Sequence, residues 1–218
     1  MPQVFRPYAD TVARAVLILL LVAPFLAVAL AYWTMRSEYV TDRTITLEQP
    51  VPFSHKHHVG GLGIDCRYCH AGVETSAVAG IPPTHTCMTC HSQLYTQTAM
   101  LAPVRASLAD DRPIRWNKVH RLPDYVYFDH SIHIAKGVGC STCHGAVDRM
   151  PLMRQAAPLT MGWCLACHRD PAPNLRPRDK IFAADWQPPA DQGEQGRKLM
   201  AQYHIDNKHL TDCSVCHR

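Results

Sequence analysis

Cys66-Arg67-Tyr68-Cys69-His70 decides how this chain folds, because its pattern, Cys-x-x-Cys-His, occurs five times. The five copies use all ten cysteines of the 218-residue chain. Two thiols at this spacing form thioethers to a haem, and the histidine after them binds the iron from one face. The pattern therefore predicts five covalently bound haem c groups. Their attachment cysteines are Cys66, Cys69, Cys87, Cys90, Cys140, Cys143, Cys164, Cys167, Cys213 and Cys216, and their proximal iron ligands are His70, His91, His144, His168 and His217.

Other interpretations of a cysteine-rich sequence explain less of the pattern. Zinc sites combine a cysteine pair with distant ligands and need no histidine directly after each pair. Thioredoxin-type motifs occur singly beside a βαβ unit. Disulfides within each pair would leave five adjacent histidines unexplained. Haem attachment accounts for every cysteine and for the histidine that follows each pair.

Composition limits the remaining functions and predicts the fold class. Hydrophobic residues make up 47% of the chain, the formal charge is +4, and Lys and Arg are scattered without a basic stripe. A nucleic-acid partner is therefore not expected. With 17 prolines and few long apolar segments, the chain lacks the means for a conventional core, and buried haem would replace one. We expect mostly coil with short α-helices wrapped around five covalent c-type haems, after one N-terminal transmembrane helix.

The N-terminal segment predicts a membrane anchor. Ala15 to Met35 holds no charged residue, and its nineteen residues to Trp33 suffice for a hydrocarbon core of about 30 Å. Arg6 and Arg14 precede the segment, which favours a cytoplasmic N-terminus. A cleaved signal peptide is the alternative, because 27–31 resembles a cleavage site, but the apolar run exceeds the usual signal core. We expect an anchor over 1–35 and a periplasmic haem domain over 36–218, held at the inner membrane by a single pass.

The haem domain contains an internal repeat. The first cysteines of successive motifs are separated by 21, 53, 24 and 49 residues, which indicates two pairs and a single motif. Each pair follows a phrase Phe-x-His-x-x-His, at 53–58 and at 128–133. These phrases define two-haem units over about 53–91 and 128–168, with a single haem over about 194–218.

Strand patterns are weak, so the remaining segments are expected to be helical turns or coil. Helical turns are predicted on both sides of Pro103 within 92–108. The five prolines of 169–196 predict an extended or coil connector, and a short helix is expected over about 194–203.

Nine histidines remain after the proximal ligands, enough to make every iron six-coordinate. The repeat favours four of them as distal ligands, and a fifth follows Trp116 on the approach to the second repeat. The predicted distal ligands are His55, His58, His130, His133 and His120. His57, His85, His204 and His209 are less favoured, and Met161 and Trp163 are better explained by packing on a porphyrin face.

Saturated iron transfers electrons but does not readily bind substrate. No catalytic acid–base pair is evident either, so we expect an electron-transfer subunit rather than an enzyme in its own right.

The two Phe-x-His-x-x-His phrases with their attachment motifs resemble class III multihaem cytochromes c. Longer stretches resemble the membrane-anchored pentahaem cytochrome subunit of bacterial alternative complex III, over essentially the whole chain. They are I-R-W-N-K-V-H-R-L-P-D-Y-V-Y-F-D-H-S-I-H (114–133), G-V-G-C-S-T-C-H-G (137–145), M-G-W-C-L-A-C-H-R (161–169) and L-T-D-C-S-V-C-H-R (210–218).

This resemblance implies a subunit that takes electrons from an iron–sulfur subunit of a quinol-oxidising membrane complex and passes them to a periplasmic acceptor. The implied partners include a polytopic quinol-binding subunit and a monohaem cytochrome. The class III pattern implies that His55 serves the Cys66/Cys69 haem and His130 the Cys140/Cys143 haem, while His58 and His133 reach other haems.

Two further hypotheses stay open. One is a stand-alone membrane-anchored multihaem quinol dehydrogenase that feeds a periplasmic reductase. The other is a haem reductase of a small nitrogen or sulfur oxyanion, which would need an open iron.

Overall fold

Short helices joined by irregular backbone make up the computed structural model, which describes residues 4–43 and 45–217. No β-strand longer than an isolated bridge occurs within these ranges. The predicted class of coil with short helices is therefore confirmed. The α-helices are α1 Ala9–Met35, α2 Cys66–Cys69, α3 Thr84–His91, α4 Ala102–Ala109, α5 His130–Ala135, α6 Cys140–His144, α7 Met161–Arg169, α8 Gln192–Gln202 and α9 Cys213–Cys216. The π- and 3-10-helical turns are η1 Lys56–Gly61, η2 Ala99–Leu101, η3 Val147–Arg149, η4 Ala172–Asn174 and η5 Arg178–Lys180.

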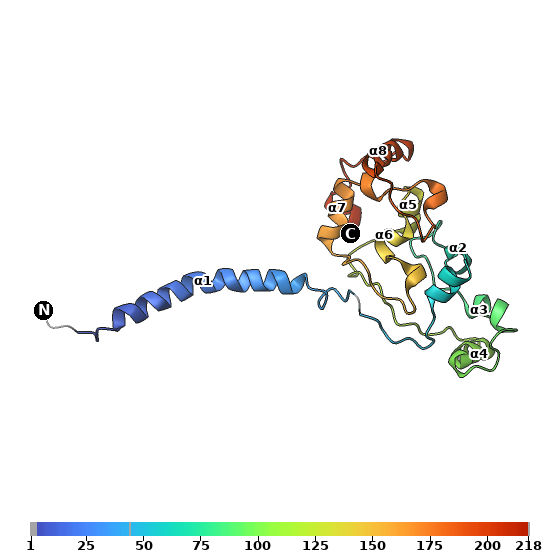
Figure 1. Ribbon diagram of the computed structural model, residues 1–218, viewed down its shortest axis with the longest axis horizontal. Coiled ribbons are helices and arrows are strands. Elements are labelled where there is room, and N and C mark those ends of the chain that lie inside the picture. The colour runs from blue at the N-terminus through green and yellow to red at the C-terminus, as the bar shows by residue number, and fades with distance from the viewer. Residues whose placement is uncertain (1–3, 44, 218) are drawn as a thin grey trace. The chain divides into compact units, whose positions relative to one another are not determined.

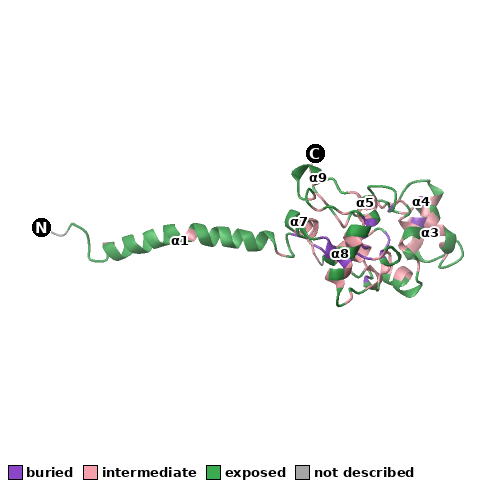
Figure 2. Cartoon of the chain, turned by 90° about the horizontal axis from the view of Figure 1, so that it is seen from above, coloured by how far each residue is buried: buried purple, intermediate pink, exposed green. Residues whose placement is uncertain are grey.

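The chain divides into two compact units, Met1–Asp42 and Arg43–Arg218. The first contains α1, which has 27 residues with Pro24 inside and none of them buried, as the green ribbon in Figure 2 shows. Its most apolar window has a mean hydropathy of 2.7, and 27 residues rise about 40 Å. This helix is long and apolar enough to cross a membrane, a property shared by membrane anchors and signal sequences.

The second unit has a small hydrophobic core. Val73, Ile134 and Ile181 form a buried cluster, and Cys140 and Phe182 pack against it. Leu175 is fully buried between the segments that follow α7. These contacts join α5, α6 and the connector after η5, so the core lies directly beside one of the Cys-x-x-Cys-His motifs.

Two predicted helical segments differ in detail from the structure. Pro103 lies in the first turn of α4 and is preceded by the turn η2, because proline fits the first helical position, where its missing N–H is not needed. The expected helix near 194–203 is α8, and it begins two residues earlier. The proline-rich segment before it is irregular backbone with the short turns η4 and η5.

Helices α3 and α4 pack side by side at one end of the second unit, and α7 lies near the C-terminus at another part of it (Figure 1). Helix α8 packs on η4, where Gln192 donates to the carbonyls of Ala172 and Leu175 at 3.2 and 2.8 Å. The five attachment motifs are therefore spread along the unit rather than gathered at one point.

Candidate metal centres

Every attachment motif begins a short helix or lies within one. The helices are α2, α3, α6, α7 and α9, as expected for Cys-x-x-Cys-His segments. Asp65 accepts a hydrogen bond from the Arg67 amide at the start of α2, which satisfies one of the free amides of that turn. All ten cysteines are free thiols. They are thus available for thioether formation, and disulfide pairing is not the role they have in this structure.

The first Phe-x-His-x-x-His phrase orients two imidazole rings around one phenyl ring. Phe53 stacks on His58 with ring centroids 4.4 Å apart and meets His55 edge-on at 4.9 Å. The His58 Nδ1–H donates to the carbonyl of Ser54 at 2.9 Å. The Ser54 hydroxyl also accepts from the backbone of His57, so one residue both caps this turn and orients the second histidine.

The second phrase repeats this geometry closely. Phe128 stacks on His133 at 4.4 Å and meets His130 edge-on at 4.7 Å. The His133 Nδ1–H donates to the carbonyl of Asp129 at 2.7 Å. The Asp129 carboxylate caps α5 by accepting from Ser131 and Ile132. The internal repeat seen in the sequence is therefore also a repeat of local structure.

Each phrase histidine faces the histidine of an attachment motif. A metal held between two Nε2 atoms, at about 2 Å from each, separates the two ring centroids by about 6 Å. The facing rings match this separation. They are His55 and His70 at 6.5 Å and 4° between planes, His58 and His91 at 6.2 Å and 63°, His130 and His144 at 6.4 Å and 5°, and His133 and His168 at 6.2 Å and 35°.

The hydrogen bonds of these rings leave the correct nitrogen for a metal. A carbonyl oxygen can only accept, so an Nδ1 beside one carries the proton and Nε2 keeps the lone pair. Iron-binding histidines usually donate their other N–H in this way. The motif histidines that do so are His70 to Gly80 at 2.6 Å, His91 to Leu94 at 3.2 Å, His168 to Leu210 at 2.8 Å and His217 to Tyr125 at 3.2 Å.

Two of the paired histidines depart from this pattern. The His55 Nδ1 is buried without a hydrogen-bond partner, whereas its repeat counterpart His130 donates to the carbonyl of Ala77 at 2.8 Å. The His144 Nδ1 lies 3.2 Å from the Nε2 of His120 instead of a carbonyl. Burial lowers the pKa of His55 to about 4 and that of His144 to about 3. Both rings are therefore neutral near pH 7, the form that binds metal.

His120 and the last motif are arranged differently from the four pairs. His120 contacts His144, with ring centroids 4.4 Å apart and planes at 84°. His217 contacts the ring of Tyr125 at 5.7 Å. Within the described part of the chain, no second imidazole is recorded against His217. The structure thus brings together four of the five predicted distal ligands with motif histidines as facing pairs.

Contacts between neighbouring motifs connect all five of them in one series. The Tyr68 hydroxyl hydrogen-bonds to Thr89 at 2.7 Å, which joins the first motif to the second. Cys66 and Cys140 interact through their thiols, and both lie on the 181–182 segment, which joins the first motif to the third. The two histidines of α5 join the third motif to the fourth, and His168 donates to Leu210 just before the fifth.

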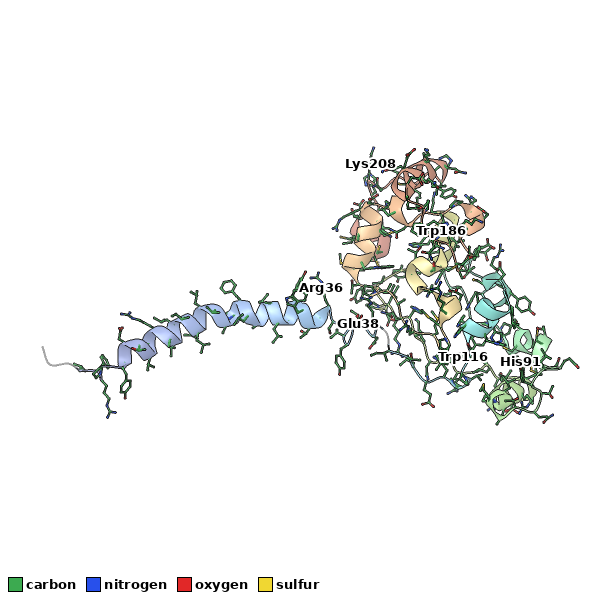
Figure 3. All side chains as sticks on the ribbon, viewed as in Figure 1. Arg36, Glu38, His91, Trp116, Trp186 and Lys208 are labelled. Carbon is green, nitrogen blue, oxygen red and sulfur yellow. The ribbon has the colours of Figure 1, made fainter. Side chains whose placement is uncertain are left out.

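A cavity of about 500 Å³ lies beside the second motif. It is lined by Cys87 and by apolar residues from two segments, including Pro83, Ile114 and Trp116. In Figure 3 the labelled His91 and Trp116 both lie toward the end of the unit that holds α3 and α4. A largely apolar cavity at an attachment cysteine suits a large apolar prosthetic group.

Arg176 is a residue that the sequence patterns did not reveal. It is 3% exposed, donates to Ser141 at 2.6 Å and Thr142 at 3.3 Å, and stacks on Trp186. It therefore holds the third attachment motif against the connector that follows α7. An isolated arginine in a proline-rich segment has no sequence signal that would have singled it out.

The less favoured candidates lie outside the facing pairs. The His57 ring meets the His58 ring edge to face, and His209 is bonded to Asp212 at 3.1 Å. His85 and His204 are exposed. Met161 is 62% exposed at the start of α7. No group of three or more His, Cys, Asp or Glu side chains suited to a metal occurs among the described residues.

A chain with five attachment motifs and facing imidazole pairs has the features of a multihaem cytochrome c. No protein-family model matches it. It is similar to the multiheme cytochrome c subunit of the menaquinone reductase of Nitratidesulfovibrio vulgaris (strain Hildenborough), at 29% identity over 209 residues that cover 90% of each chain. This similarity supports the predicted multihaem cytochrome c with covalently bound haem c. It is also consistent with a quinol-linked electron-transfer subunit rather than a catalyst by itself.

Proposed function

We propose that this chain is a pentahaem cytochrome c that relays electrons from a quinol-oxidising membrane complex to a periplasmic acceptor. The observation that carries the proposal is the set of four imidazole pairs at separations of 6.2 to 6.5 Å, each containing the histidine of one attachment motif. Bound haem iron supplies one-electron transfer at a potential set by its axial ligands and surroundings.

The chain's residues would hold the groups as follows. The distal ligands are His55 opposite His70, His58 opposite His91, His130 opposite His144, and His133 opposite His168. Each phrase thus serves two attachment sites, one immediately downstream and one in the following motif. Imidazoles on both faces leave no open coordination position at these four sites, which favours electron transfer over substrate reduction.

The motif contacts support a single path through the domain. The order is the second motif, the first, the third, the fourth and the fifth, from the α3–α4 end to α9. Because the first and third motifs share the 181–182 segment, the two repeat units meet at that point. Partner proteins would then supply electrons near one terminal motif of this series, the second or the fifth, and remove them near the other.

The relative and the resemblance support the membrane context. The relative is a subunit of a menaquinone reductase, and the resemblance is to a subunit of alternative complex III. We propose that α1 anchors the chain in the inner membrane with the haem domain in the periplasm. The proposed partners are an iron–sulfur subunit, a polytopic quinol-binding subunit and a monohaem cytochrome.

Haem content and ligation are tested on the purified full-length chain. Mass spectrometry should show five added haems with the N-terminal residues retained. Electron paramagnetic resonance should show rhombic low-spin signals from the nearly parallel pairs. The His58–His91 pair, at 63°, should give a more anisotropic signal that His58→Met removes. Fewer than five haems in fully matured protein, or high-spin iron at any of the four sites, would contradict the assignment.

The quinol-linked role is tested by comparing the isolated chain with the chain purified together with its partners. Among the described residues one helix is long and apolar enough to cross a membrane, and one such helix cannot enclose a quinol, so rapid reduction of the haems by a menaquinol analogue should require the partner subunits. Rapid quinol oxidation by the isolated chain would instead favour the stand-alone dehydrogenase.

A further inference from the structure

The third attachment motif differs from the others in what its histidine touches. Four motif histidines donate their Nδ1–H to a backbone carbonyl, at 2.6 to 3.2 Å. Among the five motif histidines in the described residues, His144 is the one whose Nδ1 has a side-chain hydrogen-bond partner. That partner is the Nε2 of His120, at 3.2 Å. The two rings meet edge to face, with their planes at 84°.

The direction of this hydrogen bond follows from the role proposed for His144, on which the inference rests. With its Nε2 assigned to the iron between it and His130, His144 carries its proton on Nδ1 and must donate. His120 then accepts through Nε2 and carries its own proton on Nδ1. His120 lies at the Nδ1 edge of His144, whereas the side toward which Nε2 would bind iron is occupied by His130 at 6.4 Å.

The segment that carries His120 is fixed close by. Asn117 and Gln49 exchange two hydrogen bonds at 2.9 Å, and the Asn117 amide also donates to Glu48 at 2.6 Å. This attaches the loop to the stretch that precedes the first repeat phrase. The 48–49 stretch therefore holds the loop three residues before His120.

We propose that His120 is a positioning residue that accepts the Nδ1–H of His144 and thereby lowers the reduction potential of the Cys140/Cys143 haem. An imidazole nitrogen is a stronger base than a backbone carbonyl, so it draws the His144 proton toward itself more strongly. His144 then becomes a better electron donor to iron, which stabilises the ferric state. The Cys140/Cys143 motif belongs to the second repeat unit and is the one that meets the first unit through the 181–182 segment, so the potential of its haem would affect transfer between the units.

The test is a redox titration, followed spectroscopically, of the purified full-length protein and of His120 variants. In His120→Leu, one of five transitions should move to higher potential while all five haems remain attached and low-spin. His120→Gln, whose amide oxygen can accept at the same position, should return that transition toward the native value. His85→Leu, at an exposed histidine of α3, is the matched control and should leave all transitions unchanged.

A second measurement needs no substitution. Low-spin ferrous haem is diamagnetic, so the reduced native protein with nitrogen-15 histidine should show scalar coupling between His144 Nδ1 and His120 Nε2. Unchanged potentials in His120→Leu, or absence of this coupling, would overturn the inference. One high-spin haem in His120→Leu would overturn it in favour of direct iron ligation by His120. Failure of the proposed function is distinguishable, because the native protein itself would then lack five haems or low-spin iron at the four paired sites.

Discussion

Phe53 and Phe128 explain how the same six-residue phrase directs two histidines toward different attachment motifs. Each phenyl ring stacks on the second histidine and meets the first edge-on, so one aromatic residue sets the directions of two imidazoles. The histidines of a phrase are three positions apart and lie on one helical turn, yet they face different attachment motifs. The phenylalanine is therefore as much part of the candidate site as the histidines.

Replacing Phe128 by Leu should destabilise the His133–His168 pair. A stacked aromatic pair contributes about 0.5–1.5 kcal/mol, and the lower end applies because Phe128 is 36% exposed. The free energy of unfolding in guanidinium should fall by about that amount. One haem should also lose its low-spin spectrum at a lower denaturant concentration than the others. Phe128→Tyr keeps the ring and should behave like the native protein; equal behaviour of the Leu and Tyr variants would show that stacking has no such role.

Helix α5 depends on the Asp129 carboxylate at its N-terminus, and this dependence should vary with pH. Hydrogen bonding, chiefly from Ser131, lowers the pKa of Asp129 below its ordinary value of 3.8. A lowered pKa means that the carboxylate stabilises the fold above about pH 3.8, and that this contribution is lost as pH falls through the lower folded value.

Asp129→Ala should therefore lower the denaturation midpoint at neutral pH, and the difference from native should shrink well below pH 3.8. Asparagine is a good N-cap without a charge, so Asp129→Asn should lose little at neutral pH. Urea unfolding of the three proteins at both pH values measures this. A penalty for alanine that is the same at both pH values would mean that the ionised carboxylate is not what stabilises α5.

Helix α8 packs on η4 through a glycine. A Cβ at Gly196 would overlap the carbonyl of Ala172, so Gly196→Ala should force the helix outward. Overpacking of this kind costs about 1–3 kcal/mol, and the melting temperature should fall. Gly193→Ala is the control within the same helix, because its nearest atom is 3.7 Å away on the flexible Arg197 side chain. That variant should be neutral or slightly stabilised, and a comparable loss in both variants would argue against close packing at Gly196.

The two compact units should be separable. Unit Arg43–Arg218 contains all five attachment motifs and every facing histidine pair, while Met1–Asp42 contains α1. An exported variant that lacks residues 1–42 should therefore be soluble without detergent, bind the same number of haems and keep the native visible spectrum. Fractionation and mass spectrometry measure both properties. Retention in the membrane fraction after this deletion would show that α1 is not the anchor, and loss of haem would show that the two units do not act independently.

The five Cys-x-x-Cys-His motifs, the repeat and the coil-rich fold with its apolar N-terminal helix could be predicted from the sequence alone, because these depend on local chemistry. Thioether attachment needs two thiols and a histidine at fixed spacing, which can be read directly from the sequence. The length of an apolar run likewise shows whether a helix could span a membrane. The repeat phrase also singled out His55, His58, His130 and His133, since the same residues recur at the same spacing.

Tertiary structure decided which histidine faces which, because the partners come from segments that only the folded backbone brings together. His168 and Leu210 are 42 positions apart, and His130 reaches Ala77 across 53 positions. His120 shows the difference most directly. Its residue type and its position before the second phrase suit an iron ligand, yet the fold places it 3.2 Å from the Nδ1 of His144. Arg176 likewise acquires its role only by being buried against the third motif. Spacing along the chain specifies covalent attachment, whereas the directions of nitrogen lone pairs depend on packing among distant segments.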